Sequence, residues 1–220
     1  MLSTHGPQTG CGFAAASNHL WLTDFMTLTL LCKYGSTKTG EDTLLFNMGS
    51  ATRCPSRSRC RVLLEGRSCY PSEVEKGHPV VRIFRDRQAL YWQSTSGEKI
   101  AGDILDKISR RPIDTKYLRY NESGDFSSQA CVDKLSHVAQ VLKSAANIIS
   151  YGYTARDDLD FSRAHFLVKG SGHDNGNNGR CMVIDEDATV PDGYVLCPEN
   201  CRVCNICMQD SKVNIAFIER

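Results

Sequence analysis

Apolar and polar residues alternate in short runs along the chain, and this period of two predicts a series of strands. The first run is "MTLTLLCKYG", which opens at Met26, and the second is "TLLFNMG". Residues 51–76 show no such period, so we expect a long irregular loop there. Five further strands are predicted over "KYLRYNE", "NIISYGY", "HFLVKG", "RCMVID" and "GYVLC".

Helical periodicity separates several of these strands. The run "VVRIFRDRQALYWQS" is helical toward its end, and Thr95 and Glu98 have capping-box spacing ahead of a helix with an isoleucine face. A longer helix is predicted from about Ser128 to Ala145, where apolar residues form one stripe. Strand, helix and strand in succession imply parallel pairing with a right-handed crossover, so the chain is predicted to be an α/β protein.

The composition is that of one globular domain, with 220 residues, 41% apolar and 23% charged. Residues 1–25 lack periodicity, so we expect a poorly structured extension followed by a single α/β catalytic domain over residues 26–220. No apolar run approaches the roughly 20 residues of a membrane helix, and no basic residue precedes the apolar stretch near the start. Neither a membrane span nor a signal peptide is therefore predicted.

Eleven cysteines, an odd and clustered number, favour a reducing cytoplasm with metal-bound thiolates over disulfides. The strongest local signal is "CPENCRVCNIC", in which four thiols fall within eleven residues. Their spacing allows one turn of chain to wrap the sulfurs around a single centre, with zinc predicted and an iron–sulfur cluster as the alternative. Buried free thiols are the simpler interpretation. The predicted ligands are Cys197, Cys201, Cys204 and Cys207.

The predicted loop over residues 51–76 carries a second, looser cysteine set. Cys54, Cys60 and Cys69 are interpreted equally well as metal ligands or as unrelated thiols. The same loop concentrates positive charge, although the whole chain has a net charge of only +1. Local charge of this kind suits a DNA phosphate backbone. The predicted DNA-binding residues are Arg53, Arg57, Arg59 and Arg61.

Polar residues follow three successive predicted strands. In α/β folds the carboxyl ends of parallel strands are where active sites form. The simpler interpretation is that Asp125 or Ser127 caps the following helix, and that loops are polar anyway. The polar groups are Glu122, Ser123, Gly124 and Asp125 after the first of these strands, Tyr153, Arg156, Asp157, Asp158 and Asp160 at the end of the second, and Lys169, Ser171 and His173 after the third.

Five stretches carry a family resemblance: "GSTKTG", "CPSRSRC…CY", "NESGDF", "YTARDDLDF" and the terminal cysteine quartet. Over roughly residues 26–207 the chain resembles the phage gene product 88-like family. That group looks related to the phage DNA-guanine transglycosylases, the DpdA proteins, which are distant kin of tRNA-guanine transglycosylases. The resemblance implies a compact TIM-barrel-like fold, complete or reduced, with a C-terminal structural zinc site, although this chain is short for a barrel and its quartet is all cysteine.

The resemblance also implies an activity, the exchange of guanine in DNA for a 7-deazaguanine base through a covalent Asp intermediate. Asp125 is then the expected nucleophile, with Asp158 or Asp160 as its acid–base partner. Tyr153 would stack on a base removed from the helix, and the other polar groups at the strand ends would bind substrate. Expected partners are DNA and a deazaguanine base. Expected substrate-binding residues are Glu122, Ser123, Gly124, Tyr153, Arg156 and Lys169.

Two further functions fit the residues. One is an iron–sulfur enzyme of the radical S-adenosylmethionine type, with a four-iron cluster on either cysteine set. The other is a non-catalytic, zinc-stapled module that binds nucleic acid with a steep salt dependence. Cluster absorbance would distinguish the first, and unchanged base composition of the DNA the second.

Overall fold

The structure is a computed structural model, and it describes residues 30, 32–35, 38–209 and 212–219. The predicted extension over residues 1–25 and the start of the first strand run lie outside the described residues. Eight strands form one sheet in the order β1-β2-β3-β4-β5-β6-β8-β7. β1 is antiparallel to β2, and every other neighbouring pair is parallel. The strands are β1 (Lys33–Tyr34), β2 (Thr43–Phe46), β3 (Tyr117–Tyr120), β4 (Ile149–Thr154), β5 (Leu167–Ser171), β6 (Arg180–Ile184), β7 (Tyr194–Leu196) and β8 (Asn214–Ile218).

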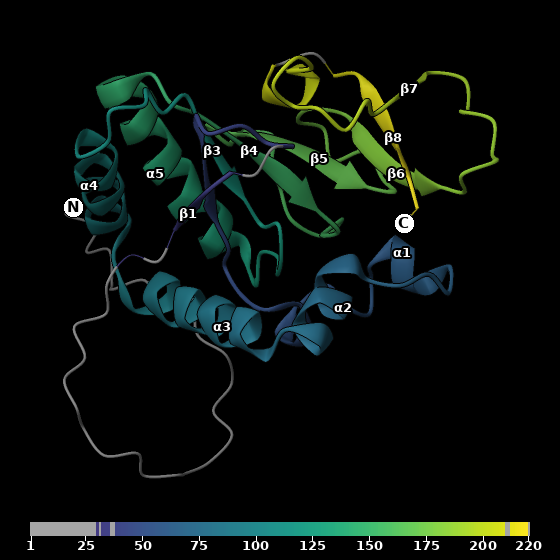
Figure 1. The fold of residues 1–220 in the computed structure, drawn as a ribbon, viewed down its shortest axis with the longest axis horizontal. Helices are drawn as coiled ribbons and strands as arrows, with labels where there is room; N and C mark the ends of the chain where they lie inside the picture. Colours follow the sequence, from purple (N-terminus) through teal and green to yellow (C-terminus); the bar gives the residue numbers. More distant parts are fainter. Residues whose placement is uncertain (1–29, 31, 36–37, 210–211, 220) are drawn as a thin grey trace, which may run out of the picture.

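The helices lie in two groups around this sheet. Figure 1 shows α4 and α5 side by side at one side of the sheet, and α1, α2 and α3 in a row along its lower edge. α5 packs on β4 and α4 packs on α5. The helices are η1 (Ala51–Arg53), α1 (Arg61–Leu64), α2 (Tyr70–Gly77), α3 (Pro79–Ser94), α4 (Gly97–Ser109), α5 (Gln129–Ala146) and η2 (Ile206–Met208).

Strand alternation decides what enters the core. On β3, Leu118 and Tyr120 are buried in the main hydrophobic cluster with the apolar stripe of α5, so the predicted α5 stripe is confirmed. Since successive side chains of a strand point to opposite faces, Arg119 lies on the face away from this cluster. The sheet therefore has a helix-covered face and a second face that carries polar and aromatic groups.

The α/β class is confirmed, but a barrel is not shown. No pairing among the described residues joins the edge strands β1 and β7. A full barrel places a helix after each of eight parallel strands and takes about 250 residues. In this chain β4, β5 and β6 follow one another through connections that contain no helix, over residues 155–166 and 172–179. The described part of the chain therefore has fewer helices than a closed barrel of this type would need to cover it.

Three local predictions need correction. The expected irregular loop over residues 51–76 contains η1, α1 and most of α2. The N-cap of α4 is Ser96, whose Oγ accepts a hydrogen bond from Lys99 N at 3.3 Å, so the cap lies one residue after the predicted Thr95. β8 was not predicted at all, because its five residues show no clear alternation.

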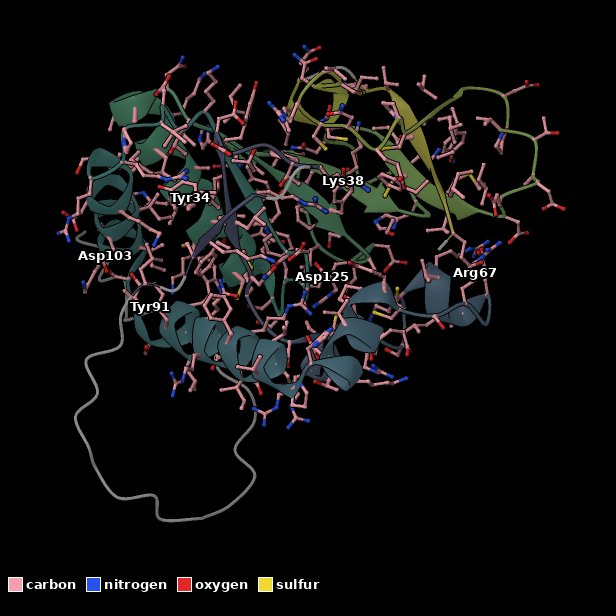
Figure 2. All side chains as sticks on the ribbon, in the orientation of Figure 1. Tyr34, Lys38, Arg67, Tyr91, Asp103 and Asp125 are labelled. Atoms are coloured by element: carbon pink, nitrogen blue, oxygen red, sulfur yellow. The ribbon has the colours of Figure 1, made fainter. Side chains whose placement is uncertain are left out.

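The segment over residues 51–77 crosses the carboxyl ends of the parallel strands. Arg59 pairs with Asp157 after β4 at 3.2 Å, and Arg67 pairs with Asp185 after β6 at 2.6 Å and with Glu219. Figure 2 shows Arg67 beside α1. We call this segment, residues 51–77, the edge segment, because it covers the place where α/β folds build their sites. None of the described helices has the length and apolar character that a membrane span requires.

Candidate functional site

A buried ion pair joins the edge segment to α3, and its carboxylate also bonds to the loop after β3. The side chains of Glu75 and Arg85 are 1% and 4% exposed, and Arg85 Nη1 donates to Glu75 Oε1 at 3.0 Å. Glu75 also accepts hydrogen bonds from Ala51 N at 2.7 Å and Ser123 Oγ at 3.1 Å. Burial opposes ionisation of Glu75, but these bonds, with those from Thr52, lower its pKa below the ordinary value. Glu75 is therefore a fixed buried carboxylate.

Asp125 lies at the centre of a second set of hydrogen bonds, between the sheet and the helices at its lower edge (Figure 2). It accepts from Ser56 Oγ at 2.7 Å, Thr154 Oγ1 at 2.7 Å, Ala155 N at 2.8 Å and its neighbour Phe126 N at 2.8 Å. Burial raises its pKa, although the four bonds act in the opposite direction. This carboxylate ties together the edge segment and the loops after β3 and β4.

Gly124 allows the loops after β2 and β3 to touch. Its φ is +77°, and a Cβ at this position would meet Gly49 N at 2.9 Å and Gly49 O at 2.8 Å. The contact is reinforced where Asn47 Oδ1 accepts from Ser123 N at 3.0 Å. The glycine predicted to bind substrate is thus required by close backbone packing. Glu122, also predicted to bind substrate, pairs with Lys33 at 3.2 Å and with Arg85 at 3.6 Å.

The other two predicted catalytic acids lie in the loop after β4. Arg156 donates to both oxygens of Asp158, at 2.7 and 2.9 Å, and this pairing lowers the pKa of Asp158 to about 2. Asp160 Oδ1 accepts from Ser162 N at 2.9 Å, which is a local turn. Arg156 Nη1 also donates to Phe126 O at 2.6 Å. Each predicted acid therefore has donors of its own: Arg156 holds Asp158, and the backbone of Ser162 holds Asp160.

The edge segment brings its three cysteines together. Burial raises the pKa of Cys54 to about 12, and Asp125, Cys60 and Cys69 lie near enough to raise it further. Burial also raises the pKa of Cys69, while nearby Arg57 acts to lower it. We call Cys54, Cys60 and Cys69 the edge cysteines. They lie in the chain directly after β2, the first parallel strand of the sheet.

His173 joins the same edge. Its Nδ1 lies 3.3 Å from Ser171 O, and its buried Nε2 has no hydrogen-bond partner among the described residues. The ring packs closely on Gly170, where a Cβ would meet it at 3.0 Å. If Nδ1 carries the proton, Nε2 is an acceptor or ligand atom.

The four carboxyl-terminal cysteines line one small cavity on the other face of the sheet. Its volume is about 50 Å³, and Tyr153 and Arg119 form its sheet side. Tyr153 OH donates to Cys207 Sγ at 3.0 Å. Burial raises the pKa values of Cys197, Cys201 and Cys207, so these thiols are protonated without a bound cation. We call this the cysteine cavity, and Cys197, Cys201, Cys204 and Cys207 the cavity cysteines.

Arg119 was missed by sequence reasoning. Its Nε is buried and has no hydrogen-bond partner among the described residues, and its guanidinium lies 5.6 Å from the ring centre of Tyr153. The alternation of β3 and β4 puts both residues on one face, and that pattern was readable in the sequence. Across the described part of the chain, no three His, Cys, Asp or Glu side chains are placed to hold a metal ion as they stand. Neither the predicted quartet site nor a metal site on Cys54, Cys60 and Cys69 is therefore shown.

Two predicted substrate-binding residues pack within the protein instead, Lys169 fully buried and Tyr153 partly buried. Tyr153 packs edge-to-face on Phe217, with ring centres 5.7 Å apart. Lys169 Nζ donates to Asn178 O at 2.6 Å and Val213 O at 2.7 Å. Both side chains hold the second face of the sheet together.

The predicted DNA-binding arginines divide into two pairs. Arg59 is bonded to Asp157, and Arg61 to Glu65 at 2.9 Å. Arg53 and Arg57 are exposed, and neither forms an ion pair with a carboxylate in the described ranges. The second pair is the one left available to a phosphate.

The fold and sites define an α/β protein with an open, mainly parallel sheet, cysteines gathered at its carboxyl edge, and four more cysteines around a cavity on one face. The family model for Gene product 88 matches residues 26–176, which is more than half of the chain. The chain therefore belongs to the Gene product 88 family, a phage protein family. The match confirms the predicted family but does not support the predicted relationship to the transglycosylases. The matched residues include the edge cysteines and end before the cavity cysteines. No curated protein and no solved structure matches the chain.

Proposed function

We propose that this protein is an iron–sulfur enzyme whose edge cysteines, Cys54, Cys60 and Cys69, hold a four-iron cluster. The observation that carries the proposal is the gathering of three thiols at the carboxyl edge of a parallel sheet, within one segment of chain. This edge is where α/β folds bind ligands. Sulfur ligands select zinc, copper(I) or iron–sulfur clusters over harder ions.

The number of thiols favours a reactive cluster over a purely structural one. Three thiolates ligate three irons of a [4Fe–4S] cluster and leave one iron without a protein ligand. When bound, such a cluster supplies one-electron chemistry to a substrate at that iron, and S-adenosylmethionine is the co-substrate class we propose. Arg57 lies near Cys69 and offsets part of the negative charge of the thiolates.

The surrounding residues form a rigid frame for this site. Ser56 stands between Cys54 and Arg57, and its Oγ is bonded to Asp125 at 2.7 Å. Glu75 binds Ala51 N at 2.7 Å, which fixes the start of the edge segment. Pre-organised frames of this kind hold ligands in place while a substrate enters and leaves.

Base exchange at DNA is the competing proposal. Base exchange needs an accessible carboxylate that can attack a carbon of the sugar as a nucleophile. Asp125 is buried and accepts four hydrogen bonds, and Asp158 is held by Arg156. A carboxylate in that state has lost most of its lone-pair capacity, so the geometry favours positioning roles for both acids. We keep DNA as the proposed substrate class, because Arg53 and Arg57 are exposed beside the edge cysteines.

Anaerobic reconstitution with iron and sulfide tests the proposal. We expect about four irons per chain, absorbance near 400 nm, and an electron paramagnetic resonance signal after reduction. The triple variant Cys54→Ser, Cys60→Ser, Cys69→Ser should lose all three. The matched control Cys197→Ser, Cys204→Ser also removes thiols and should keep them. Addition of S-adenosylmethionine to reduced wild type should change the resonance spectrum.

Two results would overturn the proposal. One is wild type that binds no iron after reconstitution, and the other is a triple variant that binds as much as wild type. In either case, incorporation of labelled deazaguanine into DNA becomes the decisive assay, since base exchange needs no cluster.

A further inference from the structure

We infer that the cysteine cavity is a separate site for a single zinc ion, bound by the four cavity cysteines, and that Arg119 is its positioning residue. The inference does not depend on the proposed function, because the cavity and the edge cysteines belong to different parts of the sheet. It rests on three observations: the thiols around one cavity, a buried donor with no partner, and the attachment of the surrounding chain.

The first observation is the donor set. Cys197, Cys201, Cys204 and Cys207 all line the same cavity, which has a volume of about 50 Å³. A cavity of this size holds an ion or a few water molecules. Zinc takes four thiolates in a tetrahedron with Zn–S distances of about 2.3 Å, so rotation of the side chains into the cavity would complete a site. Iron–sulfur clusters need more room than a single ion.

The second observation is the unpartnered Nε of Arg119. A buried donor without an acceptor costs about 1–3 kcal/mol, so a structure that keeps one points to an acceptor it does not contain. Arg119 lines the cavity, and Cys201 lies near enough to act on its pKa. A thiolate sulfur is a stronger acceptor than a thiol. Zinc binding would therefore supply the acceptor that Arg119 lacks.

The positive charges around the cavity also favour a zinc–thiolate centre. A zinc ion with four thiolates carries a formal charge of about −2, which is costly to bury unless cations lie close by. Arg119 and Lys38 both line the cavity. Lys169 lies near enough to Cys207 to act on its pKa, which it lowers. The positive charges around this cavity would stabilise an anionic zinc–thiolate centre. They would disfavour a metal cation that is not neutralised by thiolates.

The third observation concerns attachment of the chain. Cys197 N donates to Ala216 O of β8 at 2.8 Å, and Cys201 N donates to Lys38 O at 2.9 Å. Between the cavity cysteines the chain is short of regular structure and exposes Val203. A zinc ion would hold this segment over Tyr153 and Phe217, which line the same cavity. The site is therefore structural: it closes the second face of the sheet.

Metal analysis of aerobically purified protein gives the direct test. We expect about one zinc per chain in wild type, and the same amount in the matched control Cys54→Ser, Cys69→Ser. The variant Cys201→Ser, Cys204→Ser should contain none. Cobalt substitution of wild type should give thiolate-to-cobalt charge-transfer bands and the visible bands of a tetrahedral site, with no bands in this variant.

The role of Arg119 is tested by the affinity of the site for zinc, because the number of zinc ions bound per chain would not report it. Competition with a chromogenic chelator should show zinc binding weakened about 10–100-fold in Arg119→Gln, and less in Arg119→Lys, which keeps the charge. A purely structural role of Arg119 would lower the melting temperature equally in zinc-free and zinc-loaded protein, and would leave the chelator competition unchanged.

Three outcomes would overturn the inference. Wild type could lack zinc when purified from zinc-supplemented medium. The double variant could retain its zinc. Iron and sulfide could occupy the cavity cysteines, as shown by their loss from this variant and not from the edge-cysteine variant. The first two outcomes leave the iron test of the edge cysteines untouched, so in those cases the two proposals fail separately. The third would overturn both proposals, and it is recognised by iron that follows the cavity cysteines instead of the edge cysteines.

Discussion

The carboxyl edge and the cysteine cavity both bury polar groups, but they satisfy them differently. At the edge, Glu75 and Asp125 accept hydrogen bonds from backbone, hydroxyl and guanidinium donors. In the cavity, Arg119 Nε has no partner in the described residues, and three of the thiols have raised pKa values. The two carboxylates of the first region are satisfied by the protein itself, although His173 Nε2 at the same edge has no partner among the described residues. The Arg119 donor of the second region is not satisfied by any described residue.

This difference separates structural acids from ligand sites. Buried polar groups are almost always hydrogen-bonded, so a saturated carboxylate has its function within the fold. A buried donor without an acceptor in a cavity instead indicates that an acceptor from outside the protein binds there. The edge cysteines lie between these cases: the thiols of Cys54 and Cys69 each interact with one backbone N–H of the edge segment, those of Ser56 and Ser72, and so are only partly satisfied.

The largest expected effect is at the Glu75–Arg85 pair. Arg85→Ala leaves the Glu75 carboxylate buried without its cation, and we expect a loss of about 3–5 kcal/mol in the free energy of unfolding. Denaturant titration at neutral pH measures it. The control is Lys76→Ala: Lys76 follows Glu75 on α2, is exposed and pairs with Glu73, so its loss should change stability by less than about 1 kcal/mol. Equal effects of the two changes would mean that the pair is not buried in solution.

Asp125→Asn should have the next largest effect. Asn cannot accept all four bonds and presents an N–H group to donors, so we expect a loss of about 1–3 kcal/mol. A nucleophile without a structural role would instead lose activity and keep its thermal midpoint. Asp157→Asn, in an exposed loop, is the control. An unchanged midpoint in Asp125→Asn would contradict the saturated geometry.

The pH dependence of two variants sharpens the contrast between these acids. The pKa of Glu75 is lowered by folding, so its contribution is present above its unfolded pKa and is lost as pH falls. The pKa of Asp125 is raised by burial, so its contribution is present at low pH and declines as pH rises through the folded value. The cost of Glu75→Gln should therefore grow with pH, and that of Asp125→Asn should shrink. Parallel pH profiles of unfolding would show that one direction is wrong.

A smaller effect is expected at Tyr153. Tyr153→Phe removes the donor to Cys207 Sγ but keeps the ring packed on Phe217, and we expect a loss of about 0.5–1.5 kcal/mol. Thermal unfolding with and without zinc measures it. If zinc replaces this hydrogen bond, the loss should be smaller in zinc-loaded protein.

The smallest effect is expected at Asp158. Its pair with Arg156 is partly exposed, so Asp158→Asn should cost less than about 1 kcal/mol. The pKa of about 2 means that the pair persists as pH falls and its contribution is lost only as pH approaches that value. A calorimetric comparison at pH 7 and at low pH tests this, and a loss comparable to that in Asp125→Asn would place Asp158 in the buried network.

Much of the secondary structure was readable in the sequence. The stripe of α5 and the alternation of β3 depend on periods that are intrinsic to helices and strands, so no long-range information was needed. The exact start of α4 could not be predicted, because Thr95 and Ser96 are both good N-cap residues. In the structure Ser96 is the N-cap. The strands lie in chain order from β1 to β6, but β8 lies between β6 and β7, and the sequence did not predict this.

The sequence by itself determined which chemistry the chain carries: thiols in two groups, acids after strands, arginines in one segment, and the α/β class. Only the tertiary structure decided which of these groups are already satisfied by hydrogen bonds within the fold. Four donors reach Asp125 from three separate segments, whereas none of the described residues reaches Arg119 Nε. Periodicity reports the direction of a side chain relative to its own element, while hydrogen-bond saturation depends on distances between elements that are remote in sequence.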